Sequence, residues 1–163
     1  MPNWCMNNLT ISHDDSTKLQ EFVDAYNNGK TCEHFLPVPS GYYDDQRWYN
    51  WCCNNWGTKW DFGKDEYHDP AEIVNHEVDI SFNTAWSPPL PAIEQLSLQY
   101  PELEMTLEYE EEQGWGGEMT IVNGETIGER EYDIPTSHAD FVERDQECHF
   151  CLFETPAEDC PPV

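Results

Sequence analysis

Carboxylates are the most abundant reactive groups in this sequence, which holds 33 Asp and Glu against seven Lys and Arg. The runs Asp14-Asp15, Asp44-Asp45 and Glu110-Glu111-Glu112 have the residue types of a Mg²⁺ site or of a general acid–base pair. So many carboxylates produce such pairs by chance, and no EF-hand, P-loop or His-Glu-x-x-His pattern accompanies them. We therefore expect a protein that is not an enzyme and has no catalytic residues.

The seven cysteines offer a second kind of chemistry, metal binding. Cys148 and Cys151 form a Cys-x-x-Cys pair. Cys160 lies nine positions after Cys151, and His138 lies ten positions before Cys148. Three thiolates and one imidazole would satisfy tetrahedral zinc, but one Cys-x-x-Cys with a non-standard second pair is a weak signal. We expect no cofactor, with zinc at these four residues as the alternative. Cys5 is interpreted as a core residue, because no base is paired with it.

Seven tryptophans give the chain two interpretations that stay open. In one, Trp56, Lys59, Trp60 and Trp86 line a pocket that stacks on a base or a nucleotide ring. In the other, these tryptophans and Trp4 form a core that compensates for a low aliphatic content. The core interpretation is favoured, because large aromatic side chains are usually mostly buried.

The segment from Glu102 to Glu110 alternates acidic and apolar residues, which is typical of a strand with one buried face. Neighbouring carboxylates on the outer face of such a strand lie roughly 6.7 Å apart, and a regular array of them could imitate a phosphate backbone. The alternative is a solvated face whose charges prevent edge-to-edge association. The predicted acidic face comprises Glu102, Glu104, Glu108 and Glu110, extended over a following hairpin by Glu111, Glu112, Glu118, Glu125, Glu129 and Glu131.

The charge balance excludes several classes of partner. A formal net charge of −26 repels nucleic acids and anionic membrane surfaces, because a phosphate contact normally needs a cation. No stretch approaches the roughly 18 apolar residues of a membrane span, and the first residues lack the layout of a secretory signal. We expect an intracellular protein that binds neither nucleic acid nor membrane directly, and whose partner is a basic or nucleic-acid-binding protein.

The elements that must position these residues follow from periodicity and turn signals. Strands are expected at 3–12, 78–82, 103–111, 117–122 and 125–132, with Asn123-Gly124 as the turn of a hairpin. One helix is expected to follow residues 13–16 and to end at Asn27-Asn28-Gly29, and another is expected to start after Trp86 and to end at Pro101. A weak edge strand is expected at 35–39, and a short helix before Gly57.

This order predicts an α+β fold: a ferredoxin-like antiparallel sheet with two helices on one face, a Trp-rich insertion and a C-terminal β-hairpin extension. The expected ferredoxin-like domain spans residues 1–132, with the insertion at about 31–75. Residues 133–163 are expected to form an acidic, cysteine-containing tail.

Three blocks then carry a resemblance to a known family. They are Met1-Pro2-Asn3-Trp4-Cys5 with Asn7, Asn8 and Leu9-Thr10-Ile11, then Trp56-Gly57-Thr58-Lys59-Trp60, and then Phe82-Asn83-Thr84-Ala85-Trp86-Ser87-Pro88-Pro89-Leu90-Pro91. In this order they resemble the YubB-type ferredoxin-like proteins of phages and conjugative plasmids. The resemblance implies a ferredoxin-like fold and a life on mobile elements, and hence a location in the host cytoplasm. It implies no catalytic residues.

Three functional hypotheses follow. The first is a phage or mobile-element inhibitor whose carboxylate surface mimics nucleic acid and blocks a basic host protein, such as an anti-phage defence protein. The second is a module that binds or sequesters a nucleotide-like signal in a Trp-lined pocket. The third is a structural or assembly protein, for which a homo-oligomer stays open.

Overall fold

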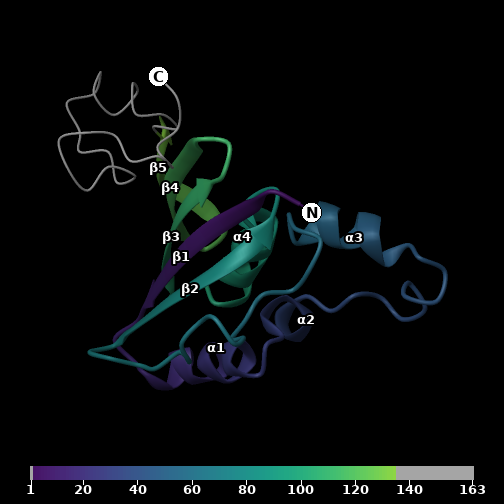
Figure 1. Ribbon diagram of the computed structural model, residues 1–163. Coiled ribbons are helices and arrows are strands. Elements are labelled where there is room, and N and C mark those ends of the chain that lie inside the picture. The colour runs from purple at the N-terminus through teal and green to yellow at the C-terminus, as the bar shows by residue number, and fades with distance from the viewer. Residues whose placement is uncertain (1, 135–163) are drawn as a thin grey trace.

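The computed structural model describes residues 2–134, apart from the side chain of Lys18, and these residues form five strands and four helices (Figure 1). The order along the chain is β1 (Trp4–Ser12), α1 (Thr17–Asn27), α2 (Thr31–Phe35), α3 (Trp48–Asn55), β2 (Glu77–Ala85), α4 (Leu90–Gln99), β3 (Glu104–Glu111), β4 (Trp115–Val122) and β5 (Glu125–Asp133). None of the helices in this part of the chain has the length and apolar character that crossing a membrane requires.

The strands form one sheet in the order β2-β1-β3-β4-β5, and every neighbouring pair is antiparallel. Alternation sets the two faces: β1 buries Cys5, Asn7, Leu9 and Ile11, while the residues between them point to the other side. The register fixes which outward residues meet, since Asn8 lies opposite Ser81 on β2 and opposite Glu108 on β3.

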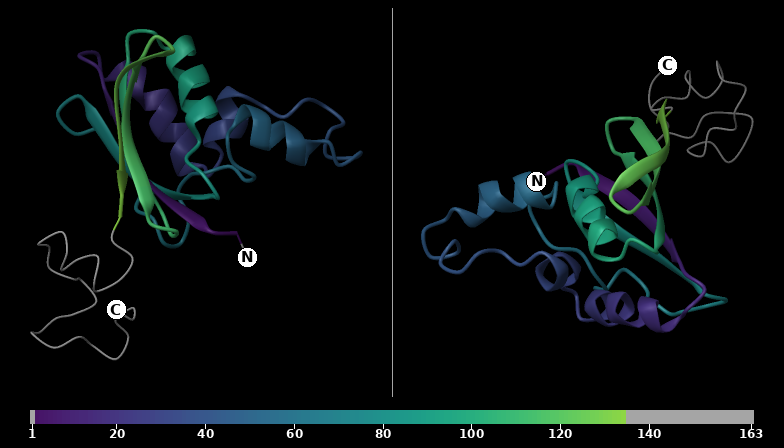
Figure 2. Two further views of the ribbon diagram at one scale, coloured as in Figure 1. Left: turned by 90° about the horizontal axis from the view of Figure 1, so that it is seen from above. Right: turned by 180° about the vertical axis from the view of Figure 1, so that it is seen from behind.

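Helices α1 and α4 lie on the same face of the sheet, as the two views of Figure 2 show. The core fills the space between them and the strands, with Leu9, Phe82, Leu107 and Ile121 among its buried side chains. From α1, Tyr26 is fully buried and donates its hydroxyl proton to the carbonyl oxygen of Ser81 at 2.8 Å. No helix in residues 2–134 covers the opposite face, which is called the open face below.

The ferredoxin-like α+β fold with a C-terminal hairpin extension is confirmed, but the edge strand expected at 35–39 is wrong. Phe35 ends α2, and Pro37 and Pro39 cannot donate to a strand ladder. Helix α2 forms because the Asp61 carboxylate accepts hydrogen bonds from the backbone N–H groups of Cys32 at 2.6 Å and Glu33 at 2.9 Å. Its formation therefore depends on a residue far along the chain.

Candidate binding surfaces

The three Trp-bearing blocks of the sequence meet at one end of β1 and β2. The N–H of Trp86 donates to the carbonyl oxygen of Asn3 at 2.9 Å. The Ser87 hydroxyl donates to the carbonyl oxygen of Gly57 at 2.7 Å. The Ala85 N–H donates to the Thr58 hydroxyl oxygen at 3.0 Å. These contacts join the blocks into one unit, which we call the junction (residues 3–7, 56–60 and 82–91).

A buried amide organises the interior of the junction. Asn7 is 2 % exposed, and its Nδ2 donates to the carbonyl oxygen of Cys5 at 2.9 Å and to that of Phe82 at 3.3 Å. The same Nδ2 also donates to the Thr84 hydroxyl oxygen at 2.9 Å, and that hydroxyl in turn donates to the carbonyl oxygen of Ser87 at 2.7 Å. These bonds satisfy polar groups that would otherwise be buried without a partner.

Gly57 lies where the junction leaves no room for a side chain. Its φ is +78°, and a Cβ atom built on it would lie 2.6 Å from Cδ of Pro91. Glycine therefore lets the loop after α3 reach the first turn of α4.

Three of the four tryptophans expected in the core lie at the surface instead. Trp56 is 2 % exposed and its Nε1 donates to the carbonyl oxygen of Leu36, so the core interpretation holds for this residue. It is wrong for Trp4, Trp60 and Trp86, which are 37 %, 41 % and 42 % exposed. Aliphatic side chains, together with other aromatic ones such as Phe22, Tyr26 and Phe82, already fill the space between sheet and helices.

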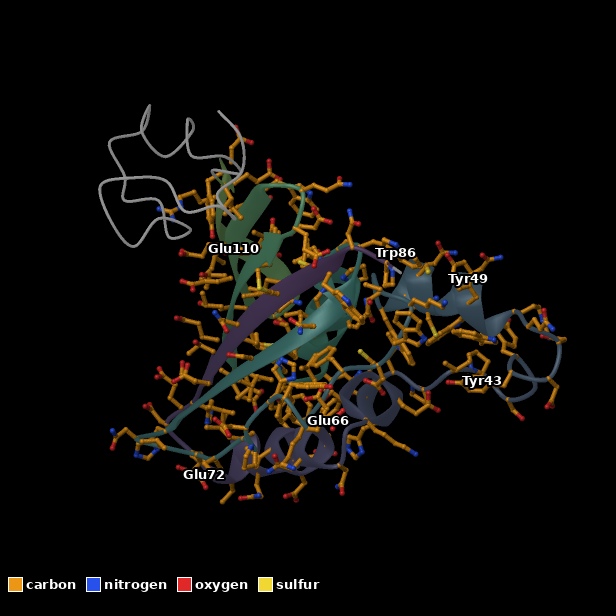
Figure 3. The ribbon with its side chains drawn as sticks, viewed as in Figure 1. Tyr43, Tyr49, Glu66, Glu72, Trp86 and Glu110 are labelled. Carbon is orange, nitrogen blue, oxygen red and sulfur yellow. The ribbon has the colours of Figure 1, made fainter. Side chains whose placement is uncertain are left out.

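The exposed rings surround a lysine. The Lys59 Nζ lies 4.3 Å from the ring centroid of Trp60, 5.7 Å from that of Tyr49 and 6.0 Å from that of Trp86. Figure 3 shows Tyr49 and Trp86 next to each other at the α3 end of the molecule, and their centroids are 6.4 Å apart. These contacts hold the ammonium group over aromatic faces in a chain that is otherwise acidic.

A cavity of about 670 Å³ lies beside Lys59. Of the predicted pocket residues, Trp56, Lys59 and Trp60 line it, whereas Trp86 does not, although its ring centroid is 6.0 Å from Lys59 Nζ. The remaining lining residues are Gly29, Lys30, Glu33, Tyr43, Trp48, Cys52 and Asp61.

The predicted acidic face is divided by the structure. Glu104, Glu108 and Glu110 of β3 are exposed and share the open face, and Glu118 of β4 lies directly opposite Glu108. Strand β2 adds Glu77 and Asp79 to the same face, which sequence reasoning missed. The alternation of Glu77-Val78-Asp79-Ile80 was the signal that could have found them.

The other predicted carboxylates lie elsewhere. Glu111 is 4 % exposed on the helix side of the sheet, and its Oε2 accepts a hydrogen bond from the N–H of Gln113 at 2.6 Å. Glu112 follows β3 and accepts from the N–H of Trp4 at 2.8 Å. Glu102 is exposed ahead of β3, and Glu125 begins β5 opposite Val122.

A β-bulge explains why Glu129 and Glu131 do not join the open face. The register shifts between Thr120 and Ile121, so Glu129 pairs with Met119 and Glu131 with Gly117, which lie on the helix side. The same shift brings Arg130 opposite Glu118. One extra residue in β5 thus reverses which of its side chains face the carboxylates of β3.

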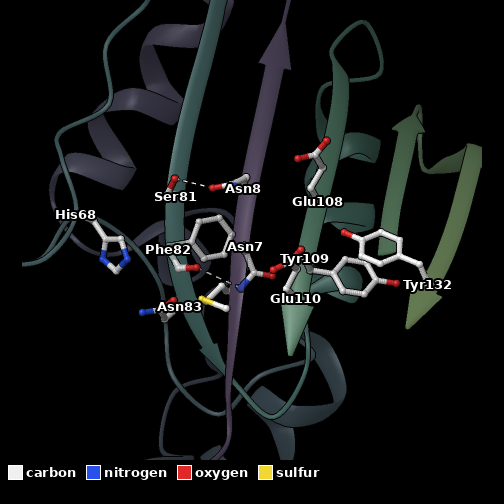
Figure 4. Close-up of a pocket in the computed structure, with 11 residues that line it drawn as sticks. Asn7, Asn8, His68, Ser81, Phe82, Asn83, Glu108, Tyr109, Glu110 and Tyr132 are labelled. Carbon is white, nitrogen blue, oxygen red and sulfur yellow. Dashed lines mark hydrogen bonds between the residues drawn. The ribbon is translucent and has the colours of Figure 1, made fainter. Parts of the chain in front are cut away.

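A trough of about 430 Å³ runs over the open face, with Glu108 and Glu110 in its lining (Figure 4). His68 bounds it beyond β2, and Tyr132 bounds it on β5. The Tyr132 ring lies over Gly116, where a Cβ atom would be 3.0 Å from Cε2. Burial, and then the nearby carboxylates of Glu110 and Glu108, raise the pKa of Tyr132, so its hydroxyl keeps its proton.

Three of the four cysteines within residues 2–134, Cys5, Cys32 and Cys52, are buried. Burial raises the pKa of Cys5 to about 12, so its thiolate is scarce at neutral pH. No group of three or more His, Cys, Asp or Glu among these residues is placed to hold a metal ion. The zinc alternative at Cys148, Cys151, Cys160 and His138 lies outside the described residues.

The model of the family described as the ferredoxin-like domain in Api92-like protein matches residues 55–153. The chain belongs to this family. The match begins at the end of α3, includes the Trp56–Trp60 and Phe82–Pro91 blocks, and continues past β5.

The fold of this Api92-like chain is also similar to a solved structure, the crystal structure of a protein api92 from Yersinia pseudotuberculosis. The TM-score is 0.56 at 10 % sequence identity, and the similarity covers 83 % of this chain and 99 % of that one. At this identity the similarity concerns the fold. A comparison with curated protein sequences found no match.

Sequence reasoning missed several residues that shape the surfaces of this Api92-like chain. Asn7 carried a signal, because it lies in phase with Leu9 and Ile11 on the buried side of β1. The sequence contains no comparable signal for Asp61 and His68, since the positions of these two residues depend on loops that pack against α2 and β2.

Proposed function

We propose that this Api92-like chain is a binding protein of phage or other mobile-element origin that inhibits a basic host protein. Its open face, with Glu104, Glu108, Glu110 and Glu118 as the central carboxylates, would occupy the nucleic-acid-binding surface of that protein as a nucleic-acid mimic. The proposed target is an anti-phage defence protein in the host cytoplasm. The observation that carries the proposal is the carboxylate array on a sheet face that no helix within residues 2–134 covers.

The geometry of the array supports this proposal. Carboxylates two positions apart on a strand lie roughly 6.7 Å from each other, and those on paired strands meet across roughly 4.8 Å. Among the outward residues of the five strands, Arg130 is the one cation. A rigid field of one sign attracts a basic groove over long range and makes association fast and sensitive to salt.

The origin rests on the resemblance of the junction blocks to YubB-type proteins of phages and conjugative plasmids. Within the junction, Gly57, Thr58 and Ser87 are occupied with holding the loop, β2 and α4 together. These roles are structural, and the exposed surfaces around the junction remain available for binding.

Affinity capture from a bacterial host lysate, with mass spectrometric identification, tests the proposal. The full chain should enrich a basic, nucleic-acid-binding protein, and recovery should fall as the salt concentration rises. The variant Glu108→Lys/Glu110→Lys serves as the control bait and should not enrich that protein. Capture of copies of the chain alone, or of no basic protein at moderate salt, would refute the inhibitor and favour a structural or assembly role.

A further inference from the structure

We infer that the cavity beside Lys59 is a binding site for a nucleotide, meaning an aromatic base that carries phosphate. This site is separate from the acidic open face, and it does not depend on the inhibitor function proposed above. The cavity volume of about 670 Å³ lies within the roughly 300–1,000 Å³ that is typical of small-molecule sites.

Aromatic side chains supply surfaces for a planar ring. Trp60, Tyr43 and Trp48 line the cavity, and the first two are 41 % and 55 % exposed. Tyr43 and Trp48 stack on each other, with their ring centroids 6.1 Å apart and their planes at 24°. Trp56 is held below them in the core by its hydrogen bond to Leu36. Bases of any identity stack on such rings, because every base has a π-face.

Two lysines supply the positive charge that a phosphate needs. Lys30 and Lys59 both line the cavity, and neither forms an ion pair with a carboxylate in residues 2–134. Lys59 is held by the ring of Trp60 at 4.3 Å, which fixes its ammonium group at the edge of the cavity. A chain with a net charge of −26 repels anions elsewhere, so this pair marks where an anion can approach.

The two carboxylates that also line the cavity are engaged by the protein itself. Asp61 accepts hydrogen bonds from the N–H groups of Cys32, Glu33 and Phe62. Glu33 accepts from the N–H of Val38 at 3.3 Å and from the hydroxyl of Tyr43 at 3.5 Å. These donors bind both carboxylates to the protein itself, whereas Lys30 and Lys59 form no ion pair within residues 2–134.

The inference is tested by titrating the purified full chain with AMP, GMP, CMP and UMP. Tryptophan fluorescence measures the binding, and a thermal shift assay measures the change in the unfolding midpoint. At least one of the four should bind saturably and raise the unfolding midpoint. Lys59→Gln and Trp60→Leu should each weaken that binding by about tenfold, the effect of losing one phosphate contact or one stacking ring. The matched controls Lys64→Gln and Trp115→Leu remove a lysine and an exposed tryptophan outside the cavity, and should leave the affinity unchanged.

Circular dichroism of each variant confirms that it is folded before the affinities are compared. The absence of binding by all four nucleotides at millimolar concentration would overturn the inference. So would equal affinity of the wild type and the two cavity variants. Binding of inorganic phosphate as tight as that of the nucleotides would also overturn it, because the rings would then contribute nothing.

Discussion

At the scale of single residues, the junction depends on side chains that satisfy buried polar atoms. Asn7 Nδ2 donates three hydrogen bonds within the core: those to Phe82 and Thr84 connect β1 to β2, and the one to Cys5 stays within β1. Asn8, the next residue, points to the open face and accepts a hydrogen bond from the Ser81 hydroxyl at 2.6 Å in solvent. Two adjacent asparagines therefore have very different energetic roles.

Replacement of the buried amide should be costly. Asn7→Ala removes three hydrogen bonds and leaves buried acceptors without their donor, so we expect the free energy of unfolding to fall by about 2 kcal/mol. Asn8→Ala, the matched control, should change it by less than about 0.5 kcal/mol. Urea denaturation followed by circular dichroism measures both, and equal losses would contradict the assigned roles.

The cysteines should differ in reactivity with pH. The thiolate is the reactive form, and burial raises the pKa of Cys5 to about 12 and that of Cys52 to about 11. Because a raised pKa keeps the thiol protonated, moving from neutral pH to mildly alkaline pH should leave Cys5 unmodified by iodoacetamide. The partly accessible Cys53 should be modified under the same conditions. Peptide mapping decides the point, and equal labelling of Cys5 and Cys53 in the folded protein would contradict this account.

At the scale of elements, alternation predicted β1, β2, β3 and β4, because each of them has one buried and one open face. Strand β5 is exposed on both faces, and the Asn123-Gly124 turn was the signal for it. Periodicity also placed Glu104, Glu108 and Glu110 together correctly. It failed for Glu129 and Glu131, because a bulge in β5 leaves Ile127 without a partner on β4 and so changes the register. Gly128, a glycine inside the strand and next to the extra residue, was the signal that could have indicated the bulge. It also failed for α2, whose five residues are held by a carboxylate 28 or 29 positions away in sequence.

The close approach of the α3 loop to α4 can be tested at one glycine. Gly57→Ala places a Cβ atom against Pro91 and forces a positive φ on alanine, so we expect a loss of about 3 kcal/mol in the free energy of unfolding. Gly41 also has a positive φ, of +84°, but no atom lies within 4 Å of its added Cβ. Gly41→Ala therefore measures the backbone effect alone, about 1 kcal/mol. Thermal and urea unfolding of both variants should show this difference. Equal losses in the free energy of unfolding would mean that Pro91 can move away from the added Cβ atom, and would contradict the close packing described here.

At the scale of the whole molecule, one sheet separates a core on its helix side from a carboxylate array on its open face. Composition predicted the acidic surface, and periodicity with turn signals predicted the fold class, because net charge and residue pattern are properties of the sequence alone. The surface exposure of Trp4, Trp60 and Trp86 was not predictable in this way, because it depends on how completely the other apolar residues fill the core.

The uncompensated charge should make stability depend on salt. With a net charge of −26, self-repulsion destabilises the folded state, and salt screens it within a Debye length of about 10 Å at 0.1 M. We expect the melting temperature to rise between low salt and about 0.5 M NaCl. The variant Glu129→Lys/Glu131→Lys carries less negative charge and should show a smaller rise. A melting temperature independent of salt in the wild type would contradict this view.

The central claim is that the open face binds a basic protein in place of nucleic acid. The most direct measurement titrates the captured partner, bound to a fluorescent DNA duplex, with the wild type, Glu108→Lys/Glu110→Lys and Glu129→Lys/Glu131→Lys. Both variants make the same change of charge, on opposite faces of the sheet. We predict that the wild type and the Glu129/Glu131 variant release the DNA, and that the Glu108/Glu110 variant needs about tenfold more protein to do so. Equal release by the two variants, or no release by the wild type, would contradict the account.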